Sequence, residues 1–168
     1  GVGQLNSHYD AMLFMSVISG RNPHYLIGEQ VLAAPIVKDL GIETIPTGYI
    51  LLDGGAGSTV EFISGTRPLP MHRKDIAVAH ALAGQFLGMK FIYLEAGSGA
   101  KEPVPTSLIK AVNNAINIPI IVGGGINSPD LARAAVNAGA SIIVTGTILE
   151  DNPDYVKQFA NAIHIKSK

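Results

Sequence analysis

The chain has 168 residues, 47% of them hydrophobic, which suits one domain with a buried α/β core. Twelve basic and thirteen acidic residues leave a formal charge of −1, which excludes the broad positive surface that nucleic acid or an anionic membrane requires. The lack of cysteine excludes disulfides and thiolate metal sites, and no apolar run is long enough to cross a bilayer, so we expect a cytoplasmic protein.

Five apolar runs with the character of β-strands recur along the chain. They comprise residues 10–15, 47–53, 90–95, 118–123 and 141–146. Helical spacing of apolar residues fills the intervals, at residues 24–40, 73–87, 106–116, 129–138 and 153–163. Strands that are apolar on both faces and alternate with helices predict a parallel sheet covered by helices.

Local signals sharpen the helix assignments. Ser128 and Asn152 each stand directly before a proline, which predicts an N-cap residue followed by proline at the first helical position. Pro35 lies inside the first helical pattern, where it should kink that helix or split it in two. The glycine-rich stretch 53–70 is predicted to be a long irregular connection that carries function or packs as a lid.

The third strand ends in a carboxylate beside a glycine-rich turn. In residues 93–99, YLEAGSG, side-chain alternation places Tyr93 and Glu95 on the same face of the strand. The glycines that follow let the backbone approach a ligand closely. Because a carboxylate among apolar neighbours is costly without a partner, we interpret this pair as functional rather than as part of a loop cap.

The last two strands also end in small residues. Gly124 and Gly125 lead from the fourth strand into a capped helix, and Gly146 and Thr147 follow the fifth. Backbone N–H groups at such positions suit a phosphate, and TIM barrels build their phosphate sites after strands seven and eight. If these are strands seven and eight, the chain supplies the last five βα units of a (β/α)₈ barrel and begins inside the third βα unit. The length of the chain by itself favours an open doubly wound sheet.

Four segments together resemble the geranylgeranylglyceryl phosphate synthase family and its bacterial relatives: YLEAGSGA (93–100), VGGGI (122–126), DAMLFMS (10–16) and AVAHALAGQFLGM (77–89). The resemblance extends over essentially the whole chain. It implies a TIM barrel prenyltransferase of phospholipid biosynthesis that joins a polyprenyl diphosphate, such as geranylgeranyl diphosphate, to sn-glycerol 1-phosphate through an ether bond. It also implies that residues 1–168 are the C-terminal portion of that barrel, as a single domain.

The resemblance further implies site residues and partners. Mg²⁺ is expected as cofactor, with its ligands in a preceding part of the barrel, so no metal ligand is assigned in this chain. Glu95 is the expected general base, and Tyr25 is expected to border the groove for the prenyl chain. The residues expected to bind glycerol phosphate are Tyr93, Leu94, Glu95, Ala96, Gly97, Ser98, Gly99, Gly124, Gly125, Gly146 and Thr147.

Two other functions stay open at this point. An isomerase or lyase acting on a sugar or indole phosphate would use the same phosphate site, but it needs an acid and base pair, for which the chain offers few candidates beyond Glu95 and Asp53. A third possibility is a truncated barrel that binds phosphate or a partner without catalysis. The open edges of such a sheet would favour association, and we expect a homo-oligomer.

Overall fold

The computed structural model describes residues 3 and 5–164, and its centre is one parallel sheet of five strands. The strands are β1 (Ala11–Val17), β2 (Glu43–Leu51), β3 (Phe91–Glu95), β4 (Ile120–Gly123) and β5 (Ile142–Val144). Each strand pairs with the next one along the chain, in the order β1-β2-β3-β4-β5. A doubly wound sheet would reverse its strand order at a switch point, so that alternative is wrong.

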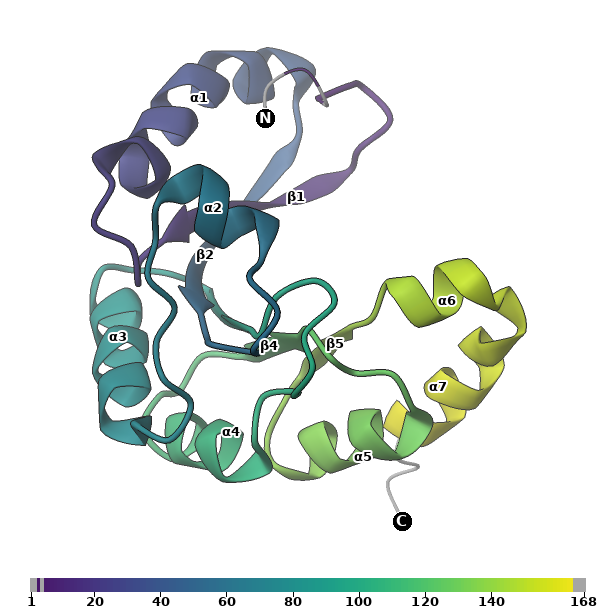
Figure 1. Cartoon of the computed structure of the whole chain (residues 1–168). Coiled ribbons are helices and arrows are strands. Elements are labelled where there is room, and N and C mark those ends of the chain that lie inside the picture. Colours follow the sequence, from purple (N-terminus) through teal and green to yellow (C-terminus); the bar gives the residue numbers. More distant parts are fainter. Residues whose placement is uncertain (1–2, 4, 165–168) are drawn as a thin grey trace.

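Helices cover the outer side of this curved sheet, which forms an arc of a barrel wall (Figure 1). They are the π-helical turn η2 (His24–Gly28), α1 (Glu29–Leu40), α3 (Lys74–Phe86), α4 (Thr106–Asn113), α5 (Pro129–Asn137), the 3₁₀ turn η3 (Pro153–Tyr155) and α7 (Val156–Ile163). Two short helices, α2 (Thr59–Ser64) and α6 (Thr147–Asp151), lie in the connections that follow β2 and β5. The predicted partial TIM barrel of about five βα units is confirmed.

Pro35 does not split the first helix, which was one of the two outcomes that we predicted for it. Helix α1 continues through it from Glu29 to Leu40, and the change of winding lies upstream, where η2 gives way to α1 after Gly28. Proline leaves the carbonyl of Val31 without its usual donor, but Val31 and Pro35 are both exposed, so water can take the place of the missing N–H.

The stretch 53–70 is less irregular than predicted, because it contains α2. The Ser58 hydroxyl accepts a hydrogen bond from the backbone N–H of Glu61 at 3.1 Å and caps this helix. A helix of so few residues is too short to show an apolar period. Ser128 caps α5 as predicted, with Leu131 N donating to its hydroxyl at 3.3 Å, whereas the Asn152 side chain forms no cap.

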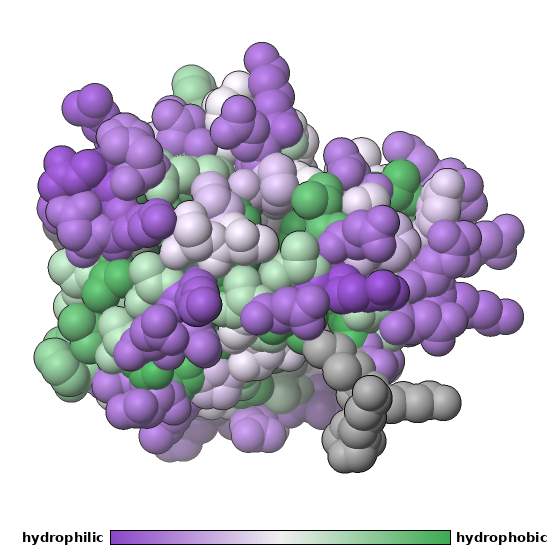
Figure 2. Space-filling view, turned by 90° about the horizontal axis from the view of Figure 1, so that it is seen from below, coloured by the Kyte–Doolittle hydropathy of each residue, from purple (hydrophilic) through white to green (hydrophobic). Residues whose placement is uncertain are grey.

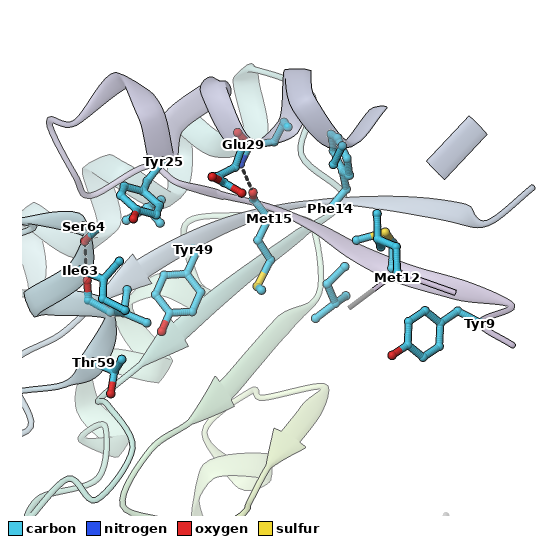
Figure 3. Close-up of a pocket in the computed structure, with 16 residues that line it drawn as sticks. Tyr9, Met12, Phe14, Met15, Tyr25, Glu29, Tyr49, Thr59, Ile63 and Ser64 are labelled. Carbon is cyan, nitrogen blue, oxygen red and sulfur yellow. Dashed lines mark hydrogen bonds between the residues drawn. The ribbon is translucent and has the colours of Figure 1, made fainter. Parts of the chain in front are cut away.

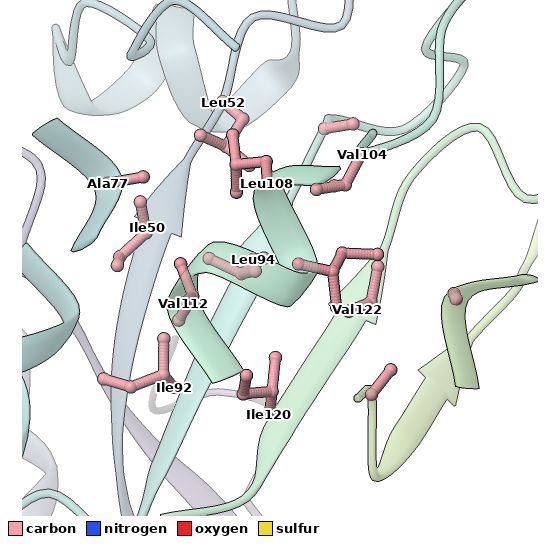
Figure 4. Packing of buried hydrophobic residues seen from close by; sticks show 14 of the residues in the cluster. Ile50, Leu52, Ala77, Ile92, Leu94, Val104, Leu108, Val112, Ile120 and Val122 are labelled. Carbon is pink, nitrogen blue, oxygen red and sulfur yellow. The ribbon is translucent and has the colours of Figure 1, made fainter. Parts of the chain in front are cut away.

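Side-chain alternation divides the apolar core into two layers. The outer layer lies between the sheet and the helices, and Figure 4 shows Ile92, Leu94 and their neighbours from α3 and α4 packed there. The inner layer contains Tyr49, Leu51, Tyr93 and Ile121. Because Glu95 follows Tyr93 by two residues in β3, both side chains belong to the inner side, as predicted.

The surface mixes hydrophobic and hydrophilic residues. On the face seen in Figure 2, hydrophobic residues lie in small groups among hydrophilic ones. Within the described part of the chain, no helix has the length and apolar character needed to cross a membrane.

Candidate functional site

The loops that follow β3, β4 and β5 meet at the carboxyl end of the sheet and enclose a cavity of about 420 Å³. We call it the carboxylate cavity, because Glu95 contributes to its wall. Its other lining residues are Gly97, Ser98, Gly99, Ala100, Gly124, Gly125, Ile126, Asn127, Val144, Thr145, Gly146, Thr147, Ile148, Glu150 and Asp151. Three turns that are far apart in the sequence are thus brought around one space.

Glu95 is held in a defined position at the end of β3. The residue is only 8% exposed, and its Oε1 accepts a hydrogen bond from the backbone N–H of Gly97 at 2.7 Å. A carboxylate can accept about four hydrogen bonds, so Glu95 keeps capacity for a further donor such as an alcohol. The short turn after β3 therefore orients the acid without saturating it.

Glycines of the neighbouring strand make room for this acid. A Cβ atom on Gly123 would lie 2.6 Å from Glu95 Oε2 and 2.7 Å from the Tyr93 hydroxyl oxygen. A Cβ on Gly124 would lie 2.6 Å from Glu95 Oε1. Gly123 was not among the residues predicted for the site, although its place in a run of three glycines was a signal for it.

Two buried phenols accompany the carboxylate. Burial raises the pKa of Tyr93, and the negative charge of Glu95 and hydrogen bonding to it raise that pKa further. Burial also raises the pKa of Tyr49, with a smaller contribution from the charge of Glu95. Both phenols therefore stay protonated at neutral pH.

Unused backbone donors surround the same cavity. Among the described residues, no acceptor receives a hydrogen bond from the backbone N–H groups of Gly124, Gly125, Gly146 or Thr147. The φ angles of Gly124 and Gly125, 82° and 70°, lie in the left-handed region that favours glycine. Free N–H groups on closely approaching backbone are the donors that a phosphate requires.

The charged side chains around the cavity are acidic. Glu150 and Asp151 of α6 line it together with Glu95, and its described wall contains no lysine or arginine. An anion bound there would depend on backbone N–H groups, and the carboxylates of α6 would oppose it.

Three of the predicted contacts do not line the cavity: Tyr93, which lies beneath Glu95 in the inner core layer, and Leu94 and Ala96. Leu94 is fully buried, Ala96 is 4% exposed, and both side chains pack in the outer core layer. Leu94 points away because side chains in a strand alternate between faces. We therefore withdraw all three side chains from the residues expected to contact glycerol phosphate.

A second, more apolar cavity of about 660 Å³ lies between β1, β2, α1 and α2. We call it the apolar groove. Tyr25 lines it as predicted, and Figure 3 shows Tyr25 and Tyr49 toward one end, with Tyr9 and Met12 at the other. Sequence reasoning missed Tyr49, although the strand alternation of residues 47–53 placed it on the same face as Leu51.

Comparison with known proteins gives concordant matches. Residues 2–163 match the sequence pattern of the PcrB family. A geranylgeranylglyceryl phosphate synthase of Chitinophaga pinensis is 49% identical over 161 residues, which cover 96% of this chain and 64% of that protein. The chain thus spans less than two thirds of the length of this curated relative.

Solved structures show the same similarity. The structure of wild-type GGGPS from Thermoplasma volcanium superposes on this chain with a TM-score of 0.88 at 37% sequence identity. The match covers 98% of this chain and 67% of the Thermoplasma volcanium chain. The (S)-3-O-geranylgeranylglyceryl phosphate synthase of Thermoplasma acidophilum, in complex with its substrate sn-glycerol-1-phosphate, also gives 0.88, at 35% identity, over 95% of this chain and 65% of that one.

Proposed function

This chain belongs to the PcrB family, and on that basis we propose that it is the greater part of a prenyltransferase. The enzyme would form an ether bond between sn-glycerol 1-phosphate and a long polyprenyl diphosphate in the biosynthesis of membrane phospholipids. One observation carries the proposal: a buried carboxylate and four backbone N–H groups with no acceptor among the described residues line one cavity, and Tyr49 of the same inner core layer as Tyr93 lines a separate apolar groove.

The carboxylate cavity suits a small phosphoester that carries an alcohol. Its phosphate would accept from the N–H groups of Gly124, Gly125, Gly146 and Thr147, which have no other acceptor in the described structure. Its hydroxyl would donate to Glu95, whose orientation is set by the N–H of Gly97. The matched synthase from Thermoplasma acidophilum, which was solved with sn-glycerol-1-phosphate, supports this choice of substrate.

Glu95 would serve as the general base. The glycerol oxygen bonds to the first carbon of the prenyl group, the bond from that carbon to the diphosphate breaks, and the bonding electron pair leaves with the diphosphate. The hydroxyl proton passes to the Glu95 carboxylate as the new carbon–oxygen bond forms. A base in hydrogen-bond reach of the alcohol contributes about 10²- to 10⁴-fold to such a reaction.

The apolar groove would hold the prenyl chain. Its volume of about 660 Å³ lies in the range of cavities that bury small organic ligands, and its walls include Met12, Phe14, Tyr25 and Ile63. A sugar phosphate has no apolar part for such a groove. An isomerase or lyase of a sugar or indole phosphate also needs an acid and base pair, for which the chain offers few candidates beyond Glu95 and Asp53, so the prenyltransferase is the better proposal.

The expectation that the enzyme uses Mg²⁺ rests on the family resemblance alone. Mg²⁺ is usually held by one or two carboxylates together with substrate phosphates. The described residues contain no cluster of three or more His, Cys, Asp or Glu side chains that could hold a metal ion. We therefore assign no metal ligand and derive no step through the ion.

Association of subunits also remains part of the proposal. The outer edges of β1 and β5 have no partner strand within the described structure, and Met15, Ile142 and Val144 are 41%, 42% and 39% exposed. Apolar side chains beside unpaired strand edges favour contact with further protein.

The test is product formation by the intact protein with sn-glycerol 1-phosphate and a series of polyprenyl diphosphates, with sn-glycerol 3-phosphate as stereochemical control. We expect a glyceryl ether from the first alcohol. Glu95→Gln should lower kcat about 10²-fold or more while leaving binding of the prenyl diphosphate unchanged. Glu102→Gln, an exposed neighbour outside the cavity, is the matched control. Absence of the ether with every diphosphate would refute the function, and full activity of Glu95→Gln would refute the base.

A further inference from the structure

Tyr49 belongs to the wall of the apolar groove and also contacts Tyr93, the neighbour of the acid in the other cavity. Its side chain lines the apolar groove, yet the residue is only 8% exposed. Its ring meets the ring of Tyr93 edge to face, with the centroids 5.1 Å apart and the planes at 65°. The strand register pairs Tyr49 directly with Tyr93, so the contact follows from the pairing of β2 with β3.

Tyr93 continues the link toward the acid. Its hydroxyl and Glu95 Oε2 both lie within 2.7 Å of the same point above Gly123. Tyr93 itself lines neither cavity. The path from the groove to the carboxylate therefore runs from Tyr49 through Tyr93 to Glu95.

The surroundings of this path are apolar and closely packed. Leu51 and Ile121, neither of them exposed, complete the inner core layer with the two tyrosines. The charge of Glu95 contributes to the raised pKa of Tyr49, after burial, and charges act strongly where little water lies between them. Two aromatic rings in contact, Tyr49 and Tyr93, thus stand between the groove wall and the acid.

We propose that Tyr49 is a positioning residue that holds Tyr93 against Glu95 and keeps water in the groove away from the acid. The inference rests on the proposed prenyl transfer. In that reaction the carbon released from diphosphate must bond to the glycerol oxygen. If water reaches the same carbon, its oxygen forms the bond, its proton passes to Glu95 or to solvent, and the products are prenyl alcohol and diphosphate. Tyr49 would therefore set the ratio of transfer to hydrolysis.

The experiment measures that ratio in the intact protein with labelled polyprenyl diphosphate and sn-glycerol 1-phosphate. Tyr49→Leu should raise the yield of prenyl alcohol relative to glyceryl ether about tenfold, because loss of the ring opens the groove toward the acid. Tyr49→Phe keeps the ring and should keep the wild-type ratio. Tyr155→Leu removes a ring from the outer core layer, away from both cavities, and should also leave the ratio unchanged.

Two results would overturn the proposal. One is an unchanged ratio in Tyr49→Leu, and the other is an equal change in Tyr49→Phe and Tyr49→Leu, which would assign the effect to the hydroxyl. If Tyr49→Leu does not fold, Tyr49→Met fills most of the same volume without a ring and takes its place.

A second readout needs no turnover. In the wild-type protein the Tyr93 phenol should stay protonated beyond the ordinary range of tyrosine, and in Tyr49→Leu it should ionise at lower pH, as followed by tyrosinate absorbance against Tyr93→Phe. If the wild-type protein forms neither ether nor prenyl alcohol, the proposed function fails, while this titration still decides whether Tyr49 screens Tyr93. An unchanged titration in that case refutes the positioning role.

Discussion

Replacing Gly123 by alanine should test how tightly the acid is confined. The added Cβ would stand 2.6 Å from Glu95 Oε2 and 2.7 Å from the Tyr93 hydroxyl. The acid would have to retreat by about 0.8 Å to reach the ordinary contact distance of 3.4 Å. The φ angle of Gly123 is not positive, so the backbone tolerates alanine and the effect is steric. A displacement of that size at a catalytic group can reduce the rate by about 10²-fold.

The assay is kcat for ether formation, together with binding of sn-glycerol 1-phosphate by calorimetry and the melting temperature. We expect overpacking to cost about 1–3 kcal/mol and to lower Tm by about 3–10 °C. Gly84→Ala is the matched control, because its Cβ would meet Ile92 Cδ1 at 2.8 Å, in the outer core layer and among apolar side chains only. It should affect Tm and spare kcat. Wild-type kcat in Gly123→Ala, or an equal loss of kcat in both variants, would refute the reasoning.

Three further predictions concern charge, pH and the cap of α2. Glu150→Gln should tighten sn-glycerol 1-phosphate binding about twofold in dilute buffer and less in high salt, measured by calorimetry, because it removes an exposed like charge from the cavity wall. The raised pKa values of Tyr49 and Tyr93 mean that the unfolded chain loses these protons first, so the free energy of unfolding should fall above about pH 10 by about 1 kcal/mol per pH unit for each phenol. Denaturant titrations should show a shallower fall in Tyr49→Phe, and an equal slope would contradict the assignment. Ser58→Ala should cost about 1 kcal/mol by loss of the hydrogen bond from Glu61 N, whereas Ser98→Ala, at an exposed turn position, should not.

The arrangement divides recognition between backbone and side chain. Phosphate binding would depend on backbone N–H groups of turns, and a substitution that leaves the backbone unchanged cannot remove them. Binding of the alcohol and of the prenyl group would depend instead on Glu95 and a few aromatic side chains. The acidic residues of α6 would weaken the hold on the phosphate, which would favour release of a charged product.

The local sequence pattern was sufficient to predict several helix starts and strand faces of this protein. The alternation of FIYLE placed Tyr93 and Glu95 on one face, and Ser128 marked the start of α5. These features depend only on residues that are close in the sequence, so the sequence pattern is enough to predict them. The same reasoning left open whether Pro35 would kink or split its helix, and the structure shows that α1 continues through it. It missed α2, because so short a helix shows no repeat of apolar residues.

Tertiary structure alone decided how distant segments meet. The strand order chose an arc of a barrel over a doubly wound sheet, and it brought the turns after residues 95, 123 and 144 around one cavity. The contact of Tyr49 with Tyr93 and the space above Gly123 depend on register between strands that lie more than 25 residues apart. Periodicity tells which way a side chain faces; only the pairing of strands and the packing of both core layers determine what it touches.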